Sequence, residues 1–105
     1  KYITHKLIKL RIFNDSNERM NLSVDDISGE IMLVSQFTLC GNTQKGNRPS
    51  YINAMDVKMA ELVYNDLIEY MSKNYNNIKT GIFQARMDIK LINDGPVTLF
   101  VRSKN

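Results

Sequence analysis

Near its end the sequence reads Ile92-Asn93-Asp94-Gly95-Pro96-Val97-Thr98-Leu99-Phe100. An apolar, β-prone run precedes the Gly95-Pro96 pair and another follows it, which predicts strands over 87–92 and 97–101 joined by a sharp turn. Glycine reaches backbone angles closed to other residues, whereas proline fixes its own φ and has no N–H to donate. The turn is therefore either a hairpin corner or a rigid device that presents carbonyl oxygens to a ligand.

A second strand is predicted over 30–40, where apolar residues occupy both faces of the first half. Polar side chains then enter at the end of the strand, at Ser35, Gln36 and Thr38. A loop over 41–50 follows, shaped by two glycines and a proline and charged by Lys45 and Arg48. This loop is either a phosphate contact or simply a solvated turn.

Helical periodicity predicts an amphipathic helix within 2–12 and a longer one from about Asp56 to Asn74. The expected buried stripe of the longer helix is Val57, Ala60, Tyr64, Leu67 and Met71, widened by Val63 and Ile68. Short extended pieces are expected at 11–13 and 78–80. A turn is expected at 14–17, a short tuck at 20–23 and a loop at 25–29. The order of elements predicts an α+β fold, a mostly antiparallel sheet or partial barrel with helices packed on one side.

The composition fits one globular domain over 1–105, with 43% hydrophobic and 24% charged residues. A net charge of +3 permits a nucleic-acid partner without requiring one. The lone Cys40 excludes an intrachain disulfide and favours a reducing, intracellular setting, and with His5 as the single histidine no metal site or cofactor is predicted. Because the sequence starts at Lys1 inside a helical pattern, we expect it to be part of a longer protein.

The side chains offer little for nucleophilic catalysis. Ser35 and Thr38 carry hydroxyls, but a hydroxyl nucleophile needs a base within hydrogen-bond reach, and His5 lies far away in sequence on a charged helix. Cys40 shows no sign of activation and is typical of a packed small side chain. Phe83 and Met87, four residues apart after Gly81, either border a planar ring or belong to the core.

Four segments in order resemble the D-aminoacyl-tRNA deacylase (D-tyrosyl-tRNA deacylase) family. They are Val34-Ser35-Gln36-Phe37-Thr38-Leu39, Lys45-Gly46-Asn47-Arg48-Pro49-Ser50, Gly81-Ile82-Phe83-Gln84-Ala85-Arg86-Met87 and Asn93-Asp94-Gly95-Pro96-Val97-Thr98. The segments 10–13 and 20–23 are similar too, so the resemblance covers nearly the whole sequence. The family carries further residues before the position of Lys1, which form opening strands and part of the site, and we expect these to be missing here.

The resemblance implies a cytoplasmic homodimer that hydrolyses the ester between a D-amino acid and the 3′-terminal adenosine of tRNA. It places the Gly95-Pro96 turn of one subunit, with a cis proline, in the site of its partner, where backbone carbonyls hold the substrate ammonium group and exclude L side chains. Ser35, Gln36, Phe37 and Thr38 would hold the ester and the adenosine, with the Gln36 and Phe37 amides near the ester carbonyl. Phe83 and Met87 would border the adenine.

Within the family pattern, either Thr38 is the nucleophile or the ribose 2′-hydroxyl of the substrate assists the attack. The absence of an evident base favours the second, because preorganised amides stabilise an oxyanion without a catalytic side chain. Two alternatives stay open: a non-catalytic module for RNA-end or aminoacyl-adenosine binding or for dimerisation, and a sister deacylase that removes other mischarged amino acids.

Overall fold

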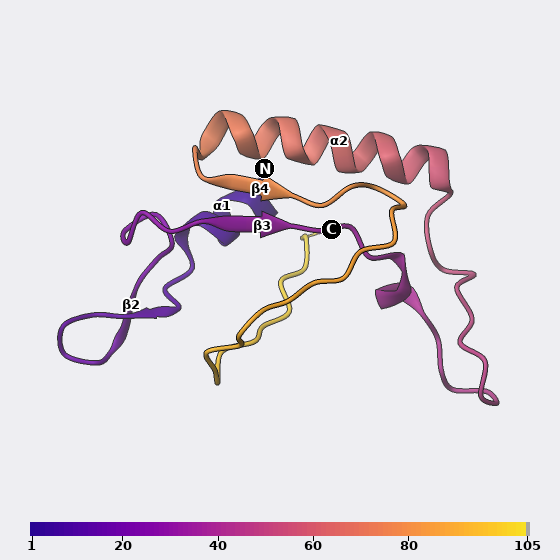
Figure 1. Ribbon diagram of the computed structural model, residues 1–105, viewed down its shortest axis with the longest axis horizontal. Coiled ribbons are helices and arrows are strands. Elements are labelled where there is room, and N and C mark those ends of the chain that lie inside the picture. The colour runs from indigo at the N-terminus through magenta and orange to yellow at the C-terminus, as the bar shows by residue number, and fades with distance from the viewer. Residues whose placement is uncertain (105) are drawn as a thin grey trace.

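The computed structural model describes residues 1–104 as an α+β arrangement in which a long helix runs above a short pair of strands (Figure 1). The elements in chain order are α1 (Tyr2–Lys9), β1 (Phe13–Asn14), β2 (Met20–Leu22), β3 (Ile31–Leu33), the 3-10 helix η1 (Phe37–Cys40), α2 (Val57–Asn74) and β4 (Ile78–Thr80). Within residues 1–104, neither α-helix is both long enough and apolar enough to cross a membrane.

Two small sheets replace the single, mostly antiparallel sheet expected from the sequence. β1 pairs with β2 in antiparallel orientation, and β3 pairs with β4 in parallel orientation, with Ile31 opposite Ile78 and Leu33 opposite Thr80. The two strands can be parallel because α2 lies between them in the chain. The helix carries the chain back to the end of the sheet at which β3 starts, so β4 runs in the same direction as β3. The α+β class is confirmed, and the mostly antiparallel arrangement is not present in these strand pairs.

Helix α2 forms where the apolar periodicity predicted it. The Asp56 carboxylate caps its start by accepting a hydrogen bond from the Met59 backbone N–H at 3.3 Å. Tyr64 and Met71 of the predicted stripe are buried, and Met71 is completely inaccessible. Val57 and Val63 are instead half exposed, at 50% and 49%, so the buried stripe is narrower than expected.

The small core packs α1 against the loop before β3 and against Tyr75, the residue that follows the last residue of α2. Ile8, Val24 and Tyr75 are buried together, and Phe13, Ile31 and Ile78 pack against them. The Tyr75 hydroxyl donates to the carbonyl oxygens of Gly29 at 2.6 Å and Val24 at 3.1 Å. These bonds fasten the 23–29 loop to the end of α2, and through it fix where β3 begins.

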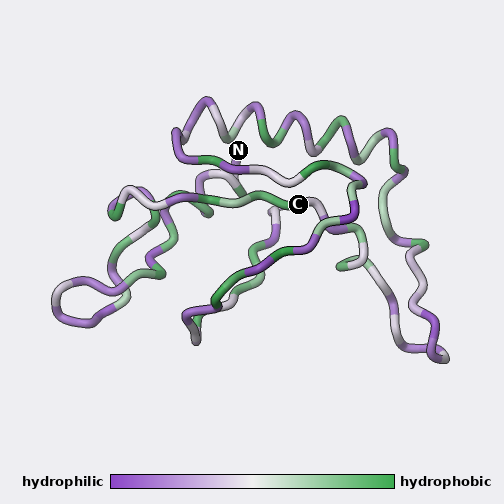
Figure 2. The backbone as a smooth tube through the Cα atoms, in the orientation of Figure 1, coloured by the Kyte–Doolittle hydropathy of each residue, from purple (hydrophilic) through white to green (hydrophobic). Residues whose placement is uncertain are grey.

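The segments 87–92 and 97–101 form no strands in the structure, contrary to the sequence prediction. Residues 87–101, which we call the excursion, run out from the sheet away from α2 and back, and apolar residues lie along them (Figure 2). Ile92 and Phe100 are 94% and 89% exposed. The alternation of side chains is that of a strand, but a strand also needs a neighbour for its backbone hydrogen bonds, and none of the described segments supplies one.

Candidate functional site

The polar residues expected at the end of a long strand lie beyond the end of β3. The strand predicted to reach Cys40 stops at Leu33, because β4 ends at Thr80 and its last pairing bond is from the Gly81 N–H to the Leu33 carbonyl oxygen, at 2.8 Å. The chain then turns into η1, closed by a 2.9 Å bond from the Gly41 N–H to the Thr38 carbonyl oxygen. Phe37 and Thr38 therefore lie on a tight exposed turn and not on a strand.

The Thr38 hydroxyl has one side-chain partner. The Gln36 side-chain amide donates to Thr38 Oγ1 in a short contact. Within residues 1–104, no histidine or carboxylate forms a hydrogen bond with this hydroxyl, and His5 is exposed on α1. Because an amide N–H is a donor and cannot accept the hydroxyl proton, Gln36 orients Thr38 without activating it.

The backbone N–H groups of Gln36 and Phe37 have no hydrogen-bond partner among the described residues. They stand at the start of η1, where the first N–H groups of a helix have no carbonyl one turn earlier to bind. Both residues are exposed, so these donors are open to an approaching group. Two adjacent free N–H groups can stabilise an oxygen that gains negative charge.

Tyr64 of α2 fixes the strand ends from which this turn departs, a role that the sequence did not reveal. Its hydroxyl donates to the Gly81 carbonyl oxygen at 3.0 Å and to the Leu33 carbonyl oxygen at 3.2 Å. The only hint in the sequence was that a tyrosine occupies position 64 of the predicted buried stripe, where an apolar side chain would be sufficient for packing. A buried tyrosine hydroxyl usually finds a polar partner.

Phe83 and Met87 lie beside the same strand ends. The Phe83 ring packs against the Tyr64 ring, with centroids 5.7 Å apart. A Cβ added to Gly81 would lie 3.0 Å from the Met87 sulfur and 3.4 Å from Val34. The structure thus brings the 81–87 segment next to the chain that enters the 35–38 turn.

The Gly95-Pro96 turn is not brought to the 35–38 turn of its own chain. Figure 1 shows it at the tip of the excursion after β4, well apart from η1. The Gly95–Pro96 peptide bond is cis, and the Gly95 N–H donates to the Asn93 carbonyl oxygen at 2.9 Å. Both residues are exposed, and no atom beyond Gly95 and its two chain neighbours lies within 4 Å of a Cβ placed on Gly95.

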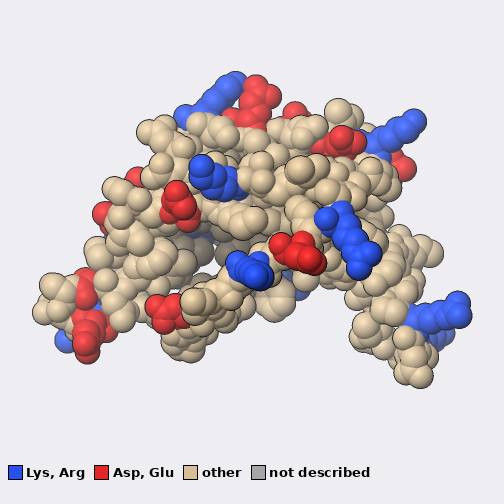
Figure 3. Space-filling view, viewed as in Figure 1, with Lys and Arg blue, Asp and Glu red and all other residues tan. Residues whose placement is uncertain are grey.

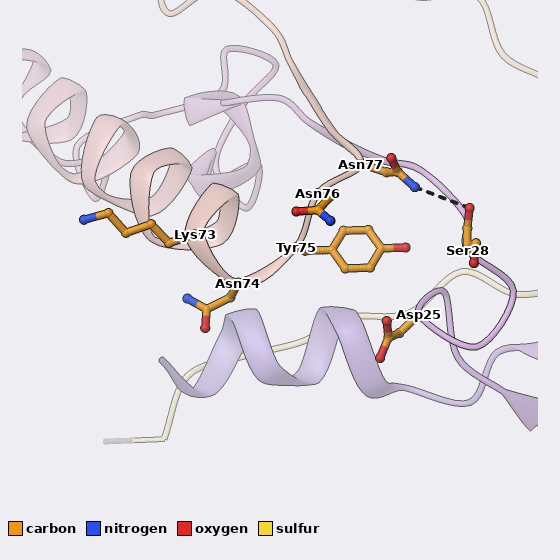
Figure 4. A pocket seen from close by; sticks show the side chains of 7 residues that line it. All are labelled: Asp25, Ser28, Lys73, Asn74, Tyr75, Asn76 and Asn77. Atoms are coloured by element: carbon orange, nitrogen blue, oxygen red, sulfur yellow. Dashed lines mark hydrogen bonds between the residues drawn. The ribbon is translucent and has the colours of Figure 1, made fainter.

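Two shallow cavities lie away from all of these residues. The larger, about 280 Å³, sits between the end of α2 and the 23–29 loop (Figure 4). Polar side chains form its wall, and the Asn77 amide reaches across to the Ser28 carbonyl oxygen at 3.4 Å. The smaller, about 220 Å³, lies between α1 and the second half of α2. Neither contains a residue that the sequence placed in the site.

The 35–38 turn itself contains no charged side chain. In the described part of the chain, no group of three or more histidine, cysteine, aspartate or glutamate residues could hold a metal ion. Cys40 is a free, exposed thiol. The ion pairs join Lys9 to Asp25 and Lys73 to Glu69, far along the chain from Thr38. The chemistry available at the turn therefore comes from backbone amides, hydroxyls and an aromatic ring.

Comparisons with known proteins converge on one family. A family model described as D-Tyr-tRNA(Tyr) deacylase matches residues 1–102. A D-aminoacyl-tRNA deacylase of Clostridium botulinum is 50% identical over 104 residues, which cover 99% of this chain and 70% of the relative. One from Clostridium acetobutylicum is 43% identical over the same lengths. Among solved structures, a c-Myc DNA Unwinding Element Binding Protein matches with a TM-score of 0.88 at 39% identity, covering 99% of this chain and 71% of that one.

Proposed function

The chain belongs to the D-Tyr-tRNA(Tyr) deacylase family, and we propose from this membership how its residues deacylate D-aminoacyl-tRNA. The enzyme is an ester hydrolase: water adds to the ester carbonyl, the bond to the ribose oxygen breaks, and free D-amino acid and tRNA leave. The observation that carries the proposal is the pair of unpartnered N–H groups at Gln36 and Phe37, exposed on the turn that follows β3.

In this proposal the ester carbonyl lies against the Gln36 and Phe37 amides. As water attacks, the carbonyl oxygen becomes an oxyanion, and both N–H groups donate to it. One such donor contributes roughly 3–4 kcal/mol to the transition state in well-studied hydrolases. Ser35, at the start of the turn, and Thr38, at its other end, hold the amino acid and the terminal adenosine on either side.

Thr38 binds the substrate and does not attack it. Its hydroxyl accepts from Gln36, and the described residues offer no base to remove its proton. The 2′-hydroxyl of the terminal ribose is adjacent to the scissile ester and assists the attacking water in place of a protein base. This assignment accounts for a hydrolytic site without a histidine.

Phe83 and Met87 would border the adenine of the terminal nucleoside. Both are half-buried beside Gly81, where Phe83 is already supported by the Tyr64 ring. An aromatic ring held by a neighbour can stack on a base at little entropic cost, and such stacking contributes roughly 1–3 kcal/mol per base. Because both segments leave the sheet at the ends of β3 and β4, the proposed adenine contact at Phe83 and Met87 lies close to the proposed ester contact at the 35–38 turn.

The Gly95-Pro96 turn would act in the site of a second copy of the chain. It is exposed and stands apart from its own 35–38 turn, and the space around Gly95 is open. Backbone carbonyl oxygens of the turn would accept hydrogen bonds from the substrate ammonium group. An L side chain would then meet this backbone and a D side chain would point away, so the turn filters substrates by excluding the wrong hand.

The exposed apolar excursion supports the same assembly. Leu91 and Leu99 are 72% and 59% exposed, next to Ile92 and Phe100, and a group of exposed apolar side chains of this kind is typical of a surface that a partner covers. We infer that 87–92 and 97–101 become strands of the expected sheet or partial barrel in the homodimer. Since aminoacyl-tRNA is used in the cytoplasm, we place the enzyme there.

The test is to incubate the protein with D-tyrosyl-tRNA and L-tyrosyl-tRNA and follow ester loss. We expect cleavage of the D ester and protection of the L ester. Cleavage of both at equal rates would contradict the filter at Gly95-Pro96. Binding without cleavage of either would favour a non-catalytic module for RNA ends. Cleavage of other mischarged esters in preference to D-tyrosyl-tRNA would favour the sister deacylase.

A further inference from the structure

A stretch around the 35–38 turn carries positive charge with no negative charge. Residues 31–55 contain Lys45 and Arg48 and neither aspartate nor glutamate, so they hold two of the three surplus positive charges of the chain. In Figure 3 the projecting arm beside η1 shows Lys and Arg but no Asp or Glu on the visible face. Elsewhere on that face the two signs are interspersed.

Both cations stand on a projecting loop, residues 41–50, which we call the basic arm. Asn42 and Ser50 close it with two backbone hydrogen bonds, of 2.7 Å and 2.9 Å, and the Asn42 side chain accepts from the Gln44 N–H at 2.9 Å. Gly46 turns the tip with φ +61°. Lys45 and Arg48 are exposed, and in residues 1–104 neither forms an ion pair.

The basic arm is attached directly to the proposed site. The Phe37 ring of η1 packs against the ring of Tyr51, just beyond the arm, in a T-shaped contact with centroids 5.1 Å apart and planes at 68°. Gly41 fits between the η1 backbone and the Tyr51 ring, because a Cβ there would lie 2.9 Å from the Thr38 carbonyl oxygen and 3.0 Å from the Tyr51 ring. The arm is thus positioned relative to the residues that would hold the terminal adenosine.

We propose that the basic arm binds the phosphate backbone of the tRNA just inward of its 3′-terminal adenosine, through Lys45 and Arg48. The inference rests on the proposed function, which puts that adenosine at the 35–38 turn. From Thr38 to Lys45 the chain can span at most about 25 Å, so the cations stay within reach of the nearest nucleotides. Lysine and arginine on an acid-free loop bind phosphates regardless of base sequence, and arginine can bind one with two parallel N–H bonds.

The experiment compares the wild type with a Lys45→Gln, Arg48→Gln double variant on two substrates. One is D-tyrosyl-tRNA, and the other is 3′-D-tyrosyl-adenosine, which carries the ester and the nucleoside but no phosphate. We expect KM for D-tyrosyl-tRNA to rise about tenfold at 0.1 M salt, because two phosphate contacts are lost. On 3′-D-tyrosyl-adenosine, kcat/KM should change less than twofold.

A second readout is the binding of uncharged tRNA as a function of salt. Each phosphate contact contributes about 0.7–0.9 to the slope of log K against log salt, so the double variant should lose roughly 1.4–1.8. A Lys73→Gln, Lys79→Gln variant removes the same charge from exposed positions at the far end of α2 and on β4. It should keep the wild-type slope.

Equal losses in the two double variants would overturn the proposal, because they would show that only net charge matters. An unchanged KM and slope in the arm variant would also overturn it. If the wild type cleaves neither substrate, the proposed function fails, and the slope measurement on uncharged tRNA still decides whether the arm binds RNA. A loss on 3′-D-tyrosyl-adenosine equal to that on tRNA would assign the arm to the ester site and contradict a backbone role.

Discussion

The Tyr64 hydroxyl donates to the Gly81 carbonyl oxygen at 3.0 Å, and the same hydroxyl reaches the Leu33 carbonyl oxygen at 3.2 Å. One side chain of α2 thereby holds the last residue of β3 to the residue that follows β4, at the point where both segments leave the sheet. The 35–38 turn departs from one of these ends and the 81–87 segment from the other. The relative position of the proposed ester and adenine contacts therefore depends on Tyr64, which supports Phe83 from behind and is not itself proposed to contact the substrate.

Tyr64→Phe should lower both stability and turnover. Loss of the hydroxyl removes a partly buried hydrogen bond, for which we expect a cost of about 1 kcal/mol in the free energy of unfolding and a Tm lower by several degrees. The kcat/KM for D-tyrosyl-tRNA should fall severalfold as the strand ends loosen. Tyr70→Phe is the matched control on the same helix, because the Tyr70 hydroxyl forms no hydrogen bond among the described residues. Equal effects of the two changes would contradict the role of Tyr64.

Met71→Ala should be the most destabilising of the simple truncations in α2. The Met71 side chain is completely buried, whereas Met59, in the first turn of the helix, is 53% exposed. Truncating a buried methionine costs roughly 2–5 kcal/mol, a large part of the stability of a small domain. Urea unfolding followed by circular dichroism measures both variants. A cost for Met59→Ala as large as that for Met71→Ala would show that the α2 stripe faces another way.

Helix α2 was the easiest element to predict because its signal is local. The periodic apolar residues and the cap at Asp56 lie within the helix itself, and the structure begins it at Val57 and ends it at Asn74. Strand β4 at 78–80 was also predicted correctly. The charged loop with Gly46 was recognised from its composition, since glycine and proline act on their own backbone.

The strand ends and the site geometry were not predictable in the same way. Whether Ser35 to Cys40 continue a strand depends on the length of β4, which lies about 40 positions later in the sequence and stops at Thr80. The alternation of apolar and polar residues over 87–92 indicates that the segment could form a strand. It does not indicate whether another strand lies beside it to pair with. The hydrogen bonds of Tyr64 are likewise invisible in sequence, because their acceptors are backbone atoms of distant residues.

Acid should weaken the loop that precedes β3, through Asp26. Its carboxylate accepts from the Ser23 backbone N–H at 2.8 Å, and the Asp26 N–H in turn donates to the Ser23 hydroxyl at 3.2 Å. The Ser23 backbone hydrogen bond, followed by the Ser23 hydroxyl and the charges of Lys9 and Arg11, lowers the pKa of Asp26 below its ordinary 3.8. A lowered folded-state pKa means that the stabilisation is complete above about pH 4 and is lost as the pH falls through the folded-state value.

Asp26→Asn should therefore reduce the Tm at pH 7 and make little difference at the lowest pH at which the protein still unfolds cooperatively. Thermal unfolding of both proteins between pH 3 and pH 7 measures the gap. Asp66→Asn, at an exposed position of α2 where the carboxylate forms no hydrogen bond among the described residues, controls for the loss of one charge. A gap between wild type and Asp26→Asn that stays constant across the whole range would contradict the assignment.

Thr38→Ala separates the two ways of cleaving the ester. If Thr38 only binds the substrate, its removal costs about one hydrogen bond, and kcat should fall by roughly tenfold or less. If Thr38 is the nucleophile, the loss should be on the order of 10⁴-fold or more, as when the nucleophile of a hydrolase is removed. Single-turnover cleavage of D-tyrosyl-tRNA distinguishes these ranges, and Thr43→Ala on the basic arm tests for a nonspecific effect of losing a hydroxyl. A variant that binds D-tyrosyl-tRNA normally but no longer cleaves it would rule out the 2′-hydroxyl route, because that route needs no protein hydroxyl at this position.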